Sequence, residues 1–297
     1  MTISTAMIKE LRERTGAGMM DCKKALQETG GDLELAIEEL RKKGAAAAAK
    51  RAGRIAAEGA IACLSDDSHS VLVEVNCETD FVAKDDSFRA FCNIVADSIL
   101  HALPEGNADL GALRISDAVS TPEGFRTIED ARQGLITKIG ENISVRRFAL
   151  MPSGQGVVGQ YLHGSRIGVL VNLSGGSDAL KLDIAMHIAA SRPLCISAQD
   201  MDAQVLERER GIYESQAAES GKPPAIVEKM VEGRIRKFLA ENTLLGQPFV
   251  KNPDITVGEL VKSEGVSVLA MERFEVGEGL EKRSDDFVAE VMSQAAG

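Results

Sequence analysis

One alternating apolar pattern occurs twice in this chain, 98 positions apart, and this repeat constrains the fold more than any single motif does. Residues 71–75 align with residues 169–173, and each run follows another short alternating run, at 59–64 and at 157–162. Alternation with a period of two predicts a β-strand, and two such runs joined by a short polar segment predict a β-hairpin. A loop and then a helical pattern follow each hairpin. The sequence therefore predicts two related subdomains.

The two copies differ in the loop after the second strand. Asp80 aligns with Asp178, but Phe81 of the first copy aligns with Ala179 of the second. A large aromatic side chain that only one copy keeps on a loop is a better candidate for function than for packing. The same four letters, Asp-Phe-Val-Ala, return at 286–289, where they open a predicted helix, and we interpret that second phenylalanine as a packing residue.

Most of the remaining sequence has a helical period. Residues 3–43 predict three short helices, and the stretches 202–219 and 225–241 predict two long charged helices around a Gly-Lys-Pro-Pro turn. These two helices should form an antiparallel hairpin that projects from the body. The other predicted elements are helices at 87–103, 110–119, 128–141, 179–191, 256–263 and after 286, and strands at 143–150 and 266–276.

The fold class predicted from this pattern is α+β, with antiparallel sheets in two related subdomains, each a β-hairpin and a helix. A small three-helix module precedes the subdomains and a C-terminal helix follows them. The predicted boundaries are 1–54 for the N-terminal module with a basic linker, 55–148 for the first subdomain, 149–200 with 243–280 for the second, 201–242 for the helical hairpin and 281–297 for the C-terminal module.

Composition excludes several classes of protein. The chain has 34 Lys and Arg against 45 Asp and Glu, a net charge of −11, so we expect no general attraction to nucleic acid or to an anionic membrane. No run of 18 apolar residues and no secretory signal is found, and five scattered cysteines without a C-x-x-C spacing indicate reduced thiols. We therefore expect a cytoplasmic protein that is an enzyme or a protein-binding factor.

Motifs for nucleotide and metal binding are weak or missing. Residues 154–159 fit G-x-G-x-x-G, but a predicted β-hairpin follows them where a dinucleotide site needs a helix, and the chain has no P-loop. None of the four histidines has a metal-ligand spacing. We expect no cofactor, no metal and no direct nucleotide binding.

Two single residues each allow two interpretations. Cys77 is either a buried structural cysteine, the commoner case, or the nucleophile of a cysteine-dependent hydrolase. His187 lies in a mostly apolar helical stretch and is either a core histidine with satisfied hydrogen bonds or a residue that faces a partner.

Residues 41–57 contain six basic side chains and no acidic ones, and form a predicted helical or flexible linker. One interpretation is a contact with RNA or the ribosome, in which Lys50, Arg51 and Arg54 would bind phosphates and binding would weaken with salt. The other is a solvated basic face, which we favour because no aromatic residues are interleaved with the charges.

Long strings along the whole chain closely resemble the bacterial elongation factor Ts family. They are KELRERTGAGMMDCKKAL at 9–26, VNCETDFVAK at 75–84, HG with IGVLV at 163–171, AMHIAAS at 185–191, GQPFV at 246–250 and RFEVGEG at 273–279. The region 104–127 departs most from the family pattern, and we assign it no role.

The resemblance implies a guanine-nucleotide exchange factor without covalent chemistry. Its partner would be elongation factor Tu, both GDP-bound and nucleotide-free, and GDP release would allow reloading with GTP during translation elongation. The N-terminal module would be ubiquitin-associated-like (UBA-like), and the helical hairpin is a candidate for homodimer contact.

The resemblance also implies which residues meet the partner. A loop that intrudes near the magnesium and nucleotide site of the partner would consist of Thr79, Asp80, Phe81 and Val82. Further candidates in the other contact regions are Arg12, Met19, Met20 and His187.

Overall fold

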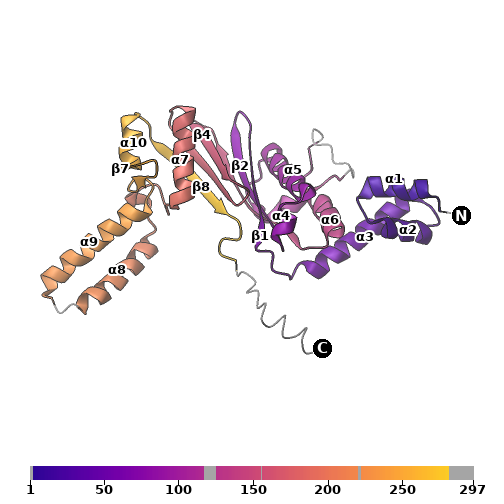
Figure 1. The fold of residues 1–297 in the computed structure, drawn as a ribbon, viewed down its shortest axis with the longest axis horizontal. Coiled ribbons are helices and arrows are strands. Elements are labelled where there is room, and N and C mark those ends of the chain that lie inside the picture. Colours follow the sequence, from indigo (N-terminus) through magenta and orange to yellow (C-terminus); the bar gives the residue numbers. More distant parts are fainter. Residues whose placement is uncertain (1–2, 117–124, 155, 220–221, 281–297) are drawn as a thin grey trace. The chain divides into compact units, whose positions relative to one another are not determined.

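The computed structural model describes residues 3–116, 125–154, 156–219 and 222–280, and the chain divides into two compact units. One unit contains the described parts of Met1–Leu64, Val71–Leu150 and Phe274–Gly297, and the other contains those of Ser65–Ser70 and Met151–Arg273. Helices and small antiparallel sheets are combined, so the predicted α+β class is confirmed (Figure 1). Within the described ranges, no helix combines the length and apolar character that a membrane span requires.

The three predicted N-terminal helices are confirmed as α1 (Thr5–Thr15), α2 (Met19–Glu28) and α3 (Leu33–Arg51). They enclose a small core of their own that includes Leu11, Cys22, Leu26 and Ala36. Gly16 ends α1 with a φ of 66°, a left-handed conformation that favours glycine because it has no Cβ.

Helix α3 settles the form of the basic linker. The helix continues through the alanine run to Arg51, so most of the stretch 41–57 is helical. It packs against α6 (Ile128–Ile139), where Ala48 is buried and a Cβ on Gly44 would lie 3.1 Å from Thr137 Oγ1. Small side chains in the last turns of α3 therefore let the two helices approach closely.

The first sheet has the order β1 (Glu58–Ser65), β2 (His69–Cys77) and β3 (Ile143–Pro152). These strands confirm the first predicted hairpin and the strand predicted at 143–150. The hydrophobic core of this unit joins the sheet to α5 (Asp86–Ala102) and α6. Phe88, Val95, Ile99 and Ile136 are fully buried in it.

The helix predicted at 110–119 is wrong for residues 113–116. A short 3₁₀ helix spans Asn107–Ala112, and Arg114 then forms an antiparallel bridge with Thr127. The N–H of Ile115 donates to the carbonyl of Arg126, which ties the backbone to a distant segment instead of to its own next turn. A local periodic pattern does not reveal such a pairing, and residues 117–119 lie outside the described ranges.

The second unit repeats the plan, with the strand order β4 (Val157–His163), β5 (Ile167–Leu173) and β8 (Val268–Glu275). Strands β4 and β5 pair antiparallel with Gly159 opposite Val171. Helix α7 (Asp178–Ser191) packs on both strands, and a Cβ on Gly159 would come within 2.7 Å of Lys181 Cβ (Figure 1). The last glycine of the G-x-G-x-x-G string therefore allows the close approach of a helix to a strand.

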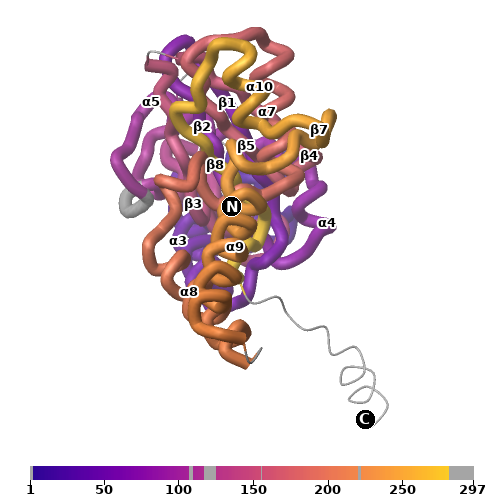
Figure 2. Tube along the Cα trace, turned by 90° about the vertical axis from the view of Figure 1, so that its left-hand side faces the viewer, coloured from indigo at the N-terminus to yellow at the C-terminus, as the bar shows by residue number. Residues whose placement is uncertain are grey.

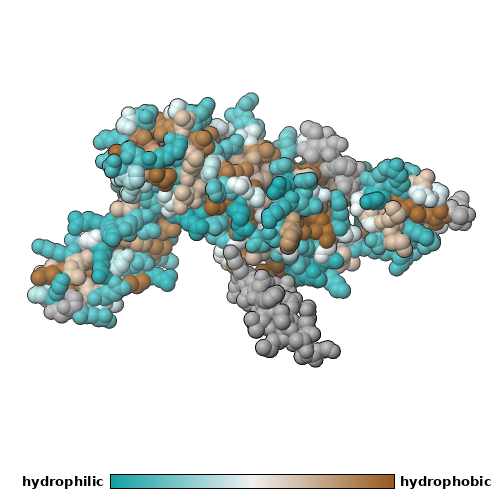
Figure 3. Space-filling model, in the orientation of Figure 1, coloured by the Kyte–Doolittle hydropathy of each residue, from teal (hydrophilic) through white to brown (hydrophobic). Residues whose placement is uncertain are grey.

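The predicted helical hairpin consists of α8 (Ala203–Ala218) and α9 (Pro224–Asn242), which lie side by side in both ribbon and tube views (Figures 1 and 2). Its thin core consists of Ala217, Val231 and Ile235. Hydrophobic surface appears among hydrophilic surface on the molecule (Figure 3). On the two helices of the hairpin, the exposed large hydrophobic residues are Val205, Ile212 and Ile226.

The second unit also contains four short elements, namely η2 (Ala198–Asp200), β6 (Pro248–Phe249), β7 (Asn252–Thr256) and α10 (Val257–Ser263). Helix α10 matches the helix predicted at 256–263, and strand β8 matches the strand predicted at 266–276. The C-terminal module predicted at 281–297, with Phe287 and its helix, lies outside the described residues.

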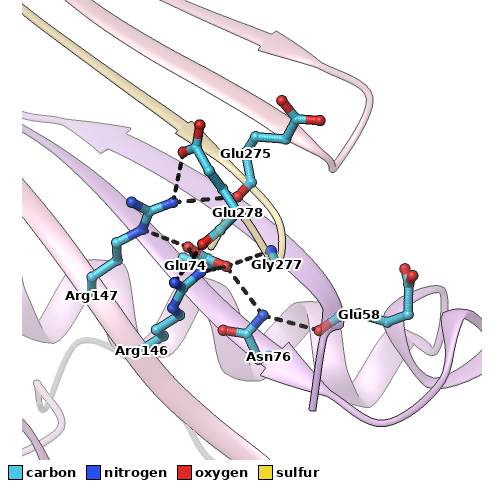
Figure 4. A network of polar contacts seen from close by, with 8 residues as sticks. All are labelled: Glu58, Glu74, Asn76, Arg146, Arg147, Glu275, Gly277 and Glu278. Carbon is cyan, nitrogen blue, oxygen red and sulfur yellow. Dashed lines mark hydrogen bonds and ion pairs between the residues drawn. The ribbon is translucent and has the colours of Figure 1, made fainter. Parts of the chain in front are cut away.

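A buried carboxylate on β2 fixes the chain that leaves β8 (Figure 4). Glu74 is fully buried, and its side chain accepts hydrogen bonds from Arg146 Nη1 at 2.9 Å and from Arg147 Nε at 2.6 Å. It also accepts the backbone N–H of Gly277 at 2.8 Å. Arg146 Nη2 donates to the carbonyl of Glu278 at 2.6 Å, so both the carboxylate and one of its arginines hold residues 277–278.

The equivalent residue of the second copy also binds backbone, but as a hydrogen-bond donor where Glu74 is an acceptor. Asn172 aligns with Glu74 and is also buried, and its Nδ2 donates to the carbonyls of Pro152 at 3.1 Å and Ser153 at 3.4 Å. In both copies a polar residue in the middle strand therefore binds the backbone of a segment that connects the two units in sequence.

We expect Glu74→Gln to destabilise the protein by about 3 kcal/mol, at the lower end of the cost of breaking a buried ion pair because both guanidinium groups keep some contact with solvent. The measurement is urea denaturation at pH 7. The matched control is Glu278→Gln, which removes a carboxylate from the exposed side of the same network and should cost less than about 1 kcal/mol. Equal stabilities of Glu74→Gln and wild type would contradict an anchoring role.

Acid should erase the difference between Glu74→Gln and wild type. Burial by itself raises the pKa of Glu74, but the donated hydrogen bonds, that of the Gly277 amide foremost, together hold the pKa of this carboxyl below its usual value. A carboxyl with a lowered pKa contributes stability above its unfolded-state pKa and loses it as the pH falls through the folded-state value. Repeating the denaturation from about pH 5 downwards should therefore show the two curves converging.

Candidate partner-binding site

The segment after β2 is a single helical turn, α4 (Asp80–Ala83), where the sequence suggested a loop. Thr79 caps it, with its Oγ1 accepting the N–H of Val82 at 3.4 Å. Val82 and Ala83 are buried in the first hydrophobic core, whereas Phe81 is 81% exposed. The turn therefore fixes Thr79 and Val82 inward and presents the Phe81 ring to solvent, which is unfavourable for a phenylalanine without a partner.

A second carboxylate holds the base of this turn. Glu141, just after α6, accepts the N–H groups of Glu78 and Thr79 through Oε2 at 3.1 and 3.0 Å, and the Thr79 hydroxyl through Oε1 at 2.7 Å. In return, Glu78 Oε1 accepts the N–H of Asn142 at 2.6 Å. We name this reciprocal arrangement of residues 78–79 and 141–142 the double-glutamate clamp. The sequence analysis missed Glu141, because nothing local distinguishes it from any polar residue after a helix.

Asp80 lies beside Phe81 at the start of the turn. Its Oδ2 accepts a hydrogen bond from Lys84 Nζ at 2.6 Å, and this bond lowers the pKa of the Asp80 carboxyl. Both side chains are well exposed, so the ion pair is free to exchange for contacts with another protein.

The first subdomain supplies no metal-binding site at this turn. Over the described parts of the chain, no group of three or more His, Cys, Asp or Glu side chains is placed to hold a metal ion. The carboxylates of Glu78 and Glu141 accept backbone N–H groups instead. These bonds hold the backbone at the base of the turn.

Cys77 has the environment of a structural cysteine. It is fully buried, and its Sγ donates to the carbonyl of Thr79 at 3.2 Å. Burial, with a smaller contribution from the charge of Glu141, raises the pKa of Cys77 to about 12. The thiolate is the nucleophilic form of cysteine, so this thiol is unsuited to the hydrolase chemistry considered for it.

Four of the six basic residues of the stretch 41–57 bind within the chain. Arg51 Nε donates to the carbonyl of Gly140 at 2.8 Å, and Arg54 Nη1 lies 3.4 Å from Glu78 Oε1. Lys42 pairs with Glu39, and Lys43 with Glu28. These contacts favour the interpretation as a solvated face over a surface for phosphate groups.

The N-terminal candidates are at the surface of their module. Met19 and Met20 open α2 and are 59% and 73% exposed, and Arg12 is exposed in the last turn of α1. Exposed, flexible apolar side chains such as these methionines are suited to contact with another protein. Their role in binding stays a prediction.

His187 lies in the other unit and is fully buried in α7. Gln247 Nε2 donates to the carbonyls of Ser191 at 3.1 Å and Glu241 at 2.8 Å, which turns Gln247 Oε1 toward His187 Nε2 at 3.0 Å. His187 Nδ1 in turn accepts the N–H of Val250 at 3.2 Å. These roles require the neutral imidazole with its proton on Nε2.

The core-histidine interpretation therefore describes the side chain of His187 in this structure. Burial lowers the pKa of His187, and the hydrogen bond to Gln247 opposes this in part. The imidazole is not itself on the surface, so a part in partner binding, which stays a prediction, would have to involve the groups that cover it.

These features indicate a class of protein. An α+β scaffold presents an exposed aromatic ring on a rigidly held turn, beside an exposed ion pair and next to a thiol that stays protonated. This combination is typical of a factor that acts by binding another protein.

The chain belongs to the elongation factor Ts family. The family model described as elongation factor TS matches residues 78–278. Proteins named elongation factor Ts from Thioalkalivibrio sulfidiphilus and Alkalilimnicola ehrlichii are 55% and 56% identical to it over 300 and 299 residues, and each comparison covers both chains completely. An elongation factor Ts from Legionella pneumophila is 53% identical over 295 residues, which covers 99% of this chain and 98% of the relative.

Mild acid should destabilise the protein through His187. A histidine whose pKa is lowered by folding binds its proton more readily in the unfolded state, so stability is lost as the pH falls below about 6.5. A single proton accounts for a slope of at most about 1.4 kcal/mol per pH unit. Urea denaturation between pH 7 and pH 5 should show a smaller slope for His187→Gln, which cannot take up the proton.

The nitrogen NMR shifts of His187 give an independent check of the same prediction. They should report the tautomer with the proton on Nε2 at pH 7. An imidazole protonated on both nitrogens at that pH, or equal slopes for wild type and His187→Gln, would contradict the assignment.

Proposed function

We propose that this protein binds the GDP complex of elongation factor Tu and accelerates GDP release, by inserting the turn 79–82 near the magnesium and phosphate site of the partner. The single observation that carries the proposal is the exposed Phe81 ring on a turn that is fixed to the core on both sides of it. Membership of the elongation factor Ts family supports it. GDP release would allow GTP to bind during translation elongation in the cytoplasm.

Exchange of this kind requires no covalent chemistry. The factor stabilises the nucleotide-free partner, and thermodynamic linkage requires that nucleotide weakens factor binding as much as the factor weakens nucleotide binding. Weakening bound GDP by 10⁴-fold needs about 5.5 kcal/mol of coupling. Burial of one phenylalanine contributes about 1.5–3 kcal/mol, so Phe81 requires help from other contacts.

The other contacts are proposed to come from separate parts of the chain. Met19, Met20 and Arg12 are exposed on the N-terminal module, which is proposed as the UBA-like part of the chain. The second subdomain around α7 is the further candidate, and the division into modules at 1–54, 55–148, 149–200 with 243–280, 201–242 and 281–297 is part of this proposal. A combined interface above about 1,600 Å² is the size expected of a specific complex.

The helical hairpin is proposed as a contact between two copies of the chain. Val205, Ile212 and Ile226 are exposed on α8 and α9 although the hairpin core itself is small. Apolar side chains left at the surface of paired helices are suited to burial against an identical hairpin.

Phe81→Ala is expected to slow factor-stimulated GDP release by about 10- to 150-fold, because the variant loses the burial energy of one aromatic side chain. The measurement is stopped-flow release of a fluorescent GDP from elongation factor Tu, with and without the factor. A matched control is Ile55→Ala, which removes another exposed apolar side chain from a part of the chain outside the proposed contact regions and should leave the rate unchanged.

Two outcomes would contradict the proposal. Wild-type factor that leaves GDP release unaccelerated would remove the exchange function. A Phe81→Ala variant as fast as wild type would retain exchange but remove the role of this ring. Stability of both variants is checked by thermal melting, and an exposed phenylalanine should change it little.

A further inference from the structure

We infer that Glu141 is a positioning residue for exchange, whose carboxylate holds the Phe81 turn in the conformation that enters the partner. This inference rests on the proposed exchange function and assigns a role to a residue outside the turn. Glu141 lies between α6 and β3, 62 positions after Thr79 in sequence.

The geometry allows one side chain to fix three groups of the turn. Glu141 Oε2 accepts the N–H groups of Glu78 and Thr79, and Oε1 accepts the Thr79 hydroxyl at 2.7 Å. The same hydroxyl oxygen accepts the N–H of Val82. A chain of hydrogen bonds therefore runs from Glu141 through Thr79 to the residue that follows Phe81.

An ionised carboxylate suits this position because it only accepts hydrogen bonds. All three groups that point at Glu141 are donors. An amide in its place would offer one acceptor oxygen and would direct an NH₂ group at the other donors. Hydrogen bonds to a charged acceptor are also shorter and stronger than those to a neutral one.

The support under Glu141 is itself fixed to other elements of the unit. Arg51 of α3 donates to the carbonyl of Gly140 at 2.8 Å, and Asn142 Nδ2 donates to the carbonyl of Arg54 at 2.8 Å. Asn142 N–H completes the double-glutamate clamp by donating to Glu78. Through these bonds, the clamp connects the turn to the end of α3 and to the segment between α6 and β3.

A fixed turn has a consequence for exchange. An exposed aromatic ring on a mobile loop would have to be ordered when the complex forms, and that loss of freedom weakens binding. A turn held in place before the encounter avoids this cost, and small misplacements of a functional group can be expensive. Loosening the clamp should therefore slow exchange through the changed position of the turn.

The test is Glu141→Gln in the full-length chain, measured by stopped-flow release of fluorescent GDP from elongation factor Tu. We expect a rate roughly tenfold below wild type, in keeping with the loss of charge-assisted hydrogen bonds. The matched control is Glu129→Gln. Glu129 is a carboxylate of α6 that binds Arg132 and Gln133, away from the turn, and its loss should leave the exchange rate unchanged.

Two further readouts separate positioning from a general loss of stability. The amide hydrogens of Glu78 and Thr79 should exchange faster with solvent in Glu141→Gln than in Glu129→Gln at equal global stability. The double variant Phe81→Ala/Glu141→Gln should be no slower than Phe81→Ala alone, because the clamp acts through the ring that is missing. Should Glu141→Gln fail to fold, Glu141→Asp keeps the charge, cannot span all three donors and should show the same pattern in weaker form.

The outcomes distinguish this inference from the proposed function. If wild type accelerates GDP release, Phe81→Ala is slow and Glu141→Gln is as fast as wild type, the positioning role is wrong and the exchange function stands. A double variant about tenfold slower than Phe81→Ala would also overturn the positioning role, because Glu141 would then act elsewhere. If wild type does not accelerate release, both proposals fall together.

Discussion

The buried carboxylate of Glu74 is the interaction on which the first unit depends most. One face of β2 packs its valines against α5 and α6, and the other face carries Glu74 under the chain that follows β8. A charge placed there is stable only because two guanidinium groups and a backbone N–H surround it. The network also attaches residues 277–278 to the sheet. The buried carboxylate of Glu74, which is costly to remove from water, therefore also fixes the chain after β8.

The chain uses one chemical solution twice in this unit. Glu74 and Glu141 both accept backbone N–H groups of a segment that is distant in sequence. In both cases the N–H groups that are bound lie outside the helices and central parts of the strands. In the second unit Asn172, the repeat equivalent of Glu74, binds backbone carbonyls instead. The two copies thus share a polar position in the middle strand, which is a carboxylate where it accepts a backbone N–H and an amide where it donates to backbone carbonyls.

The proposed activity makes use of rigidity at the turn 79–82. Val82 and Ala83 in the core, the Thr79 cap and the Glu141 carboxylate together determine where Phe81 stands. A factor that acts by differential binding gains affinity when the turn is already ordered, because less conformational entropy is then lost as the complex forms. The exposed methionines of α2 are more than 50 positions from the turn in sequence, which suits a proposed partner that is contacted by several parts of the chain.

Local patterns in the sequence determined the hairpins, most of the helices and the choice of Phe81, because alternation, helical period and the asymmetry of the repeat are properties of neighbouring residues or of aligned copies. They misassigned residues 113–115 to a helix, whereas the backbone there pairs with residues 126–128. Only the tertiary structure revealed the bonds from Glu74 to Gly277 and from Glu141 to Thr79, which join residues 203 and 62 positions apart. Only the tertiary structure showed that His187 is buried and hydrogen-bonded to Gln247. Contacts over such separations have no period, so folding of the chain alone brings these groups together.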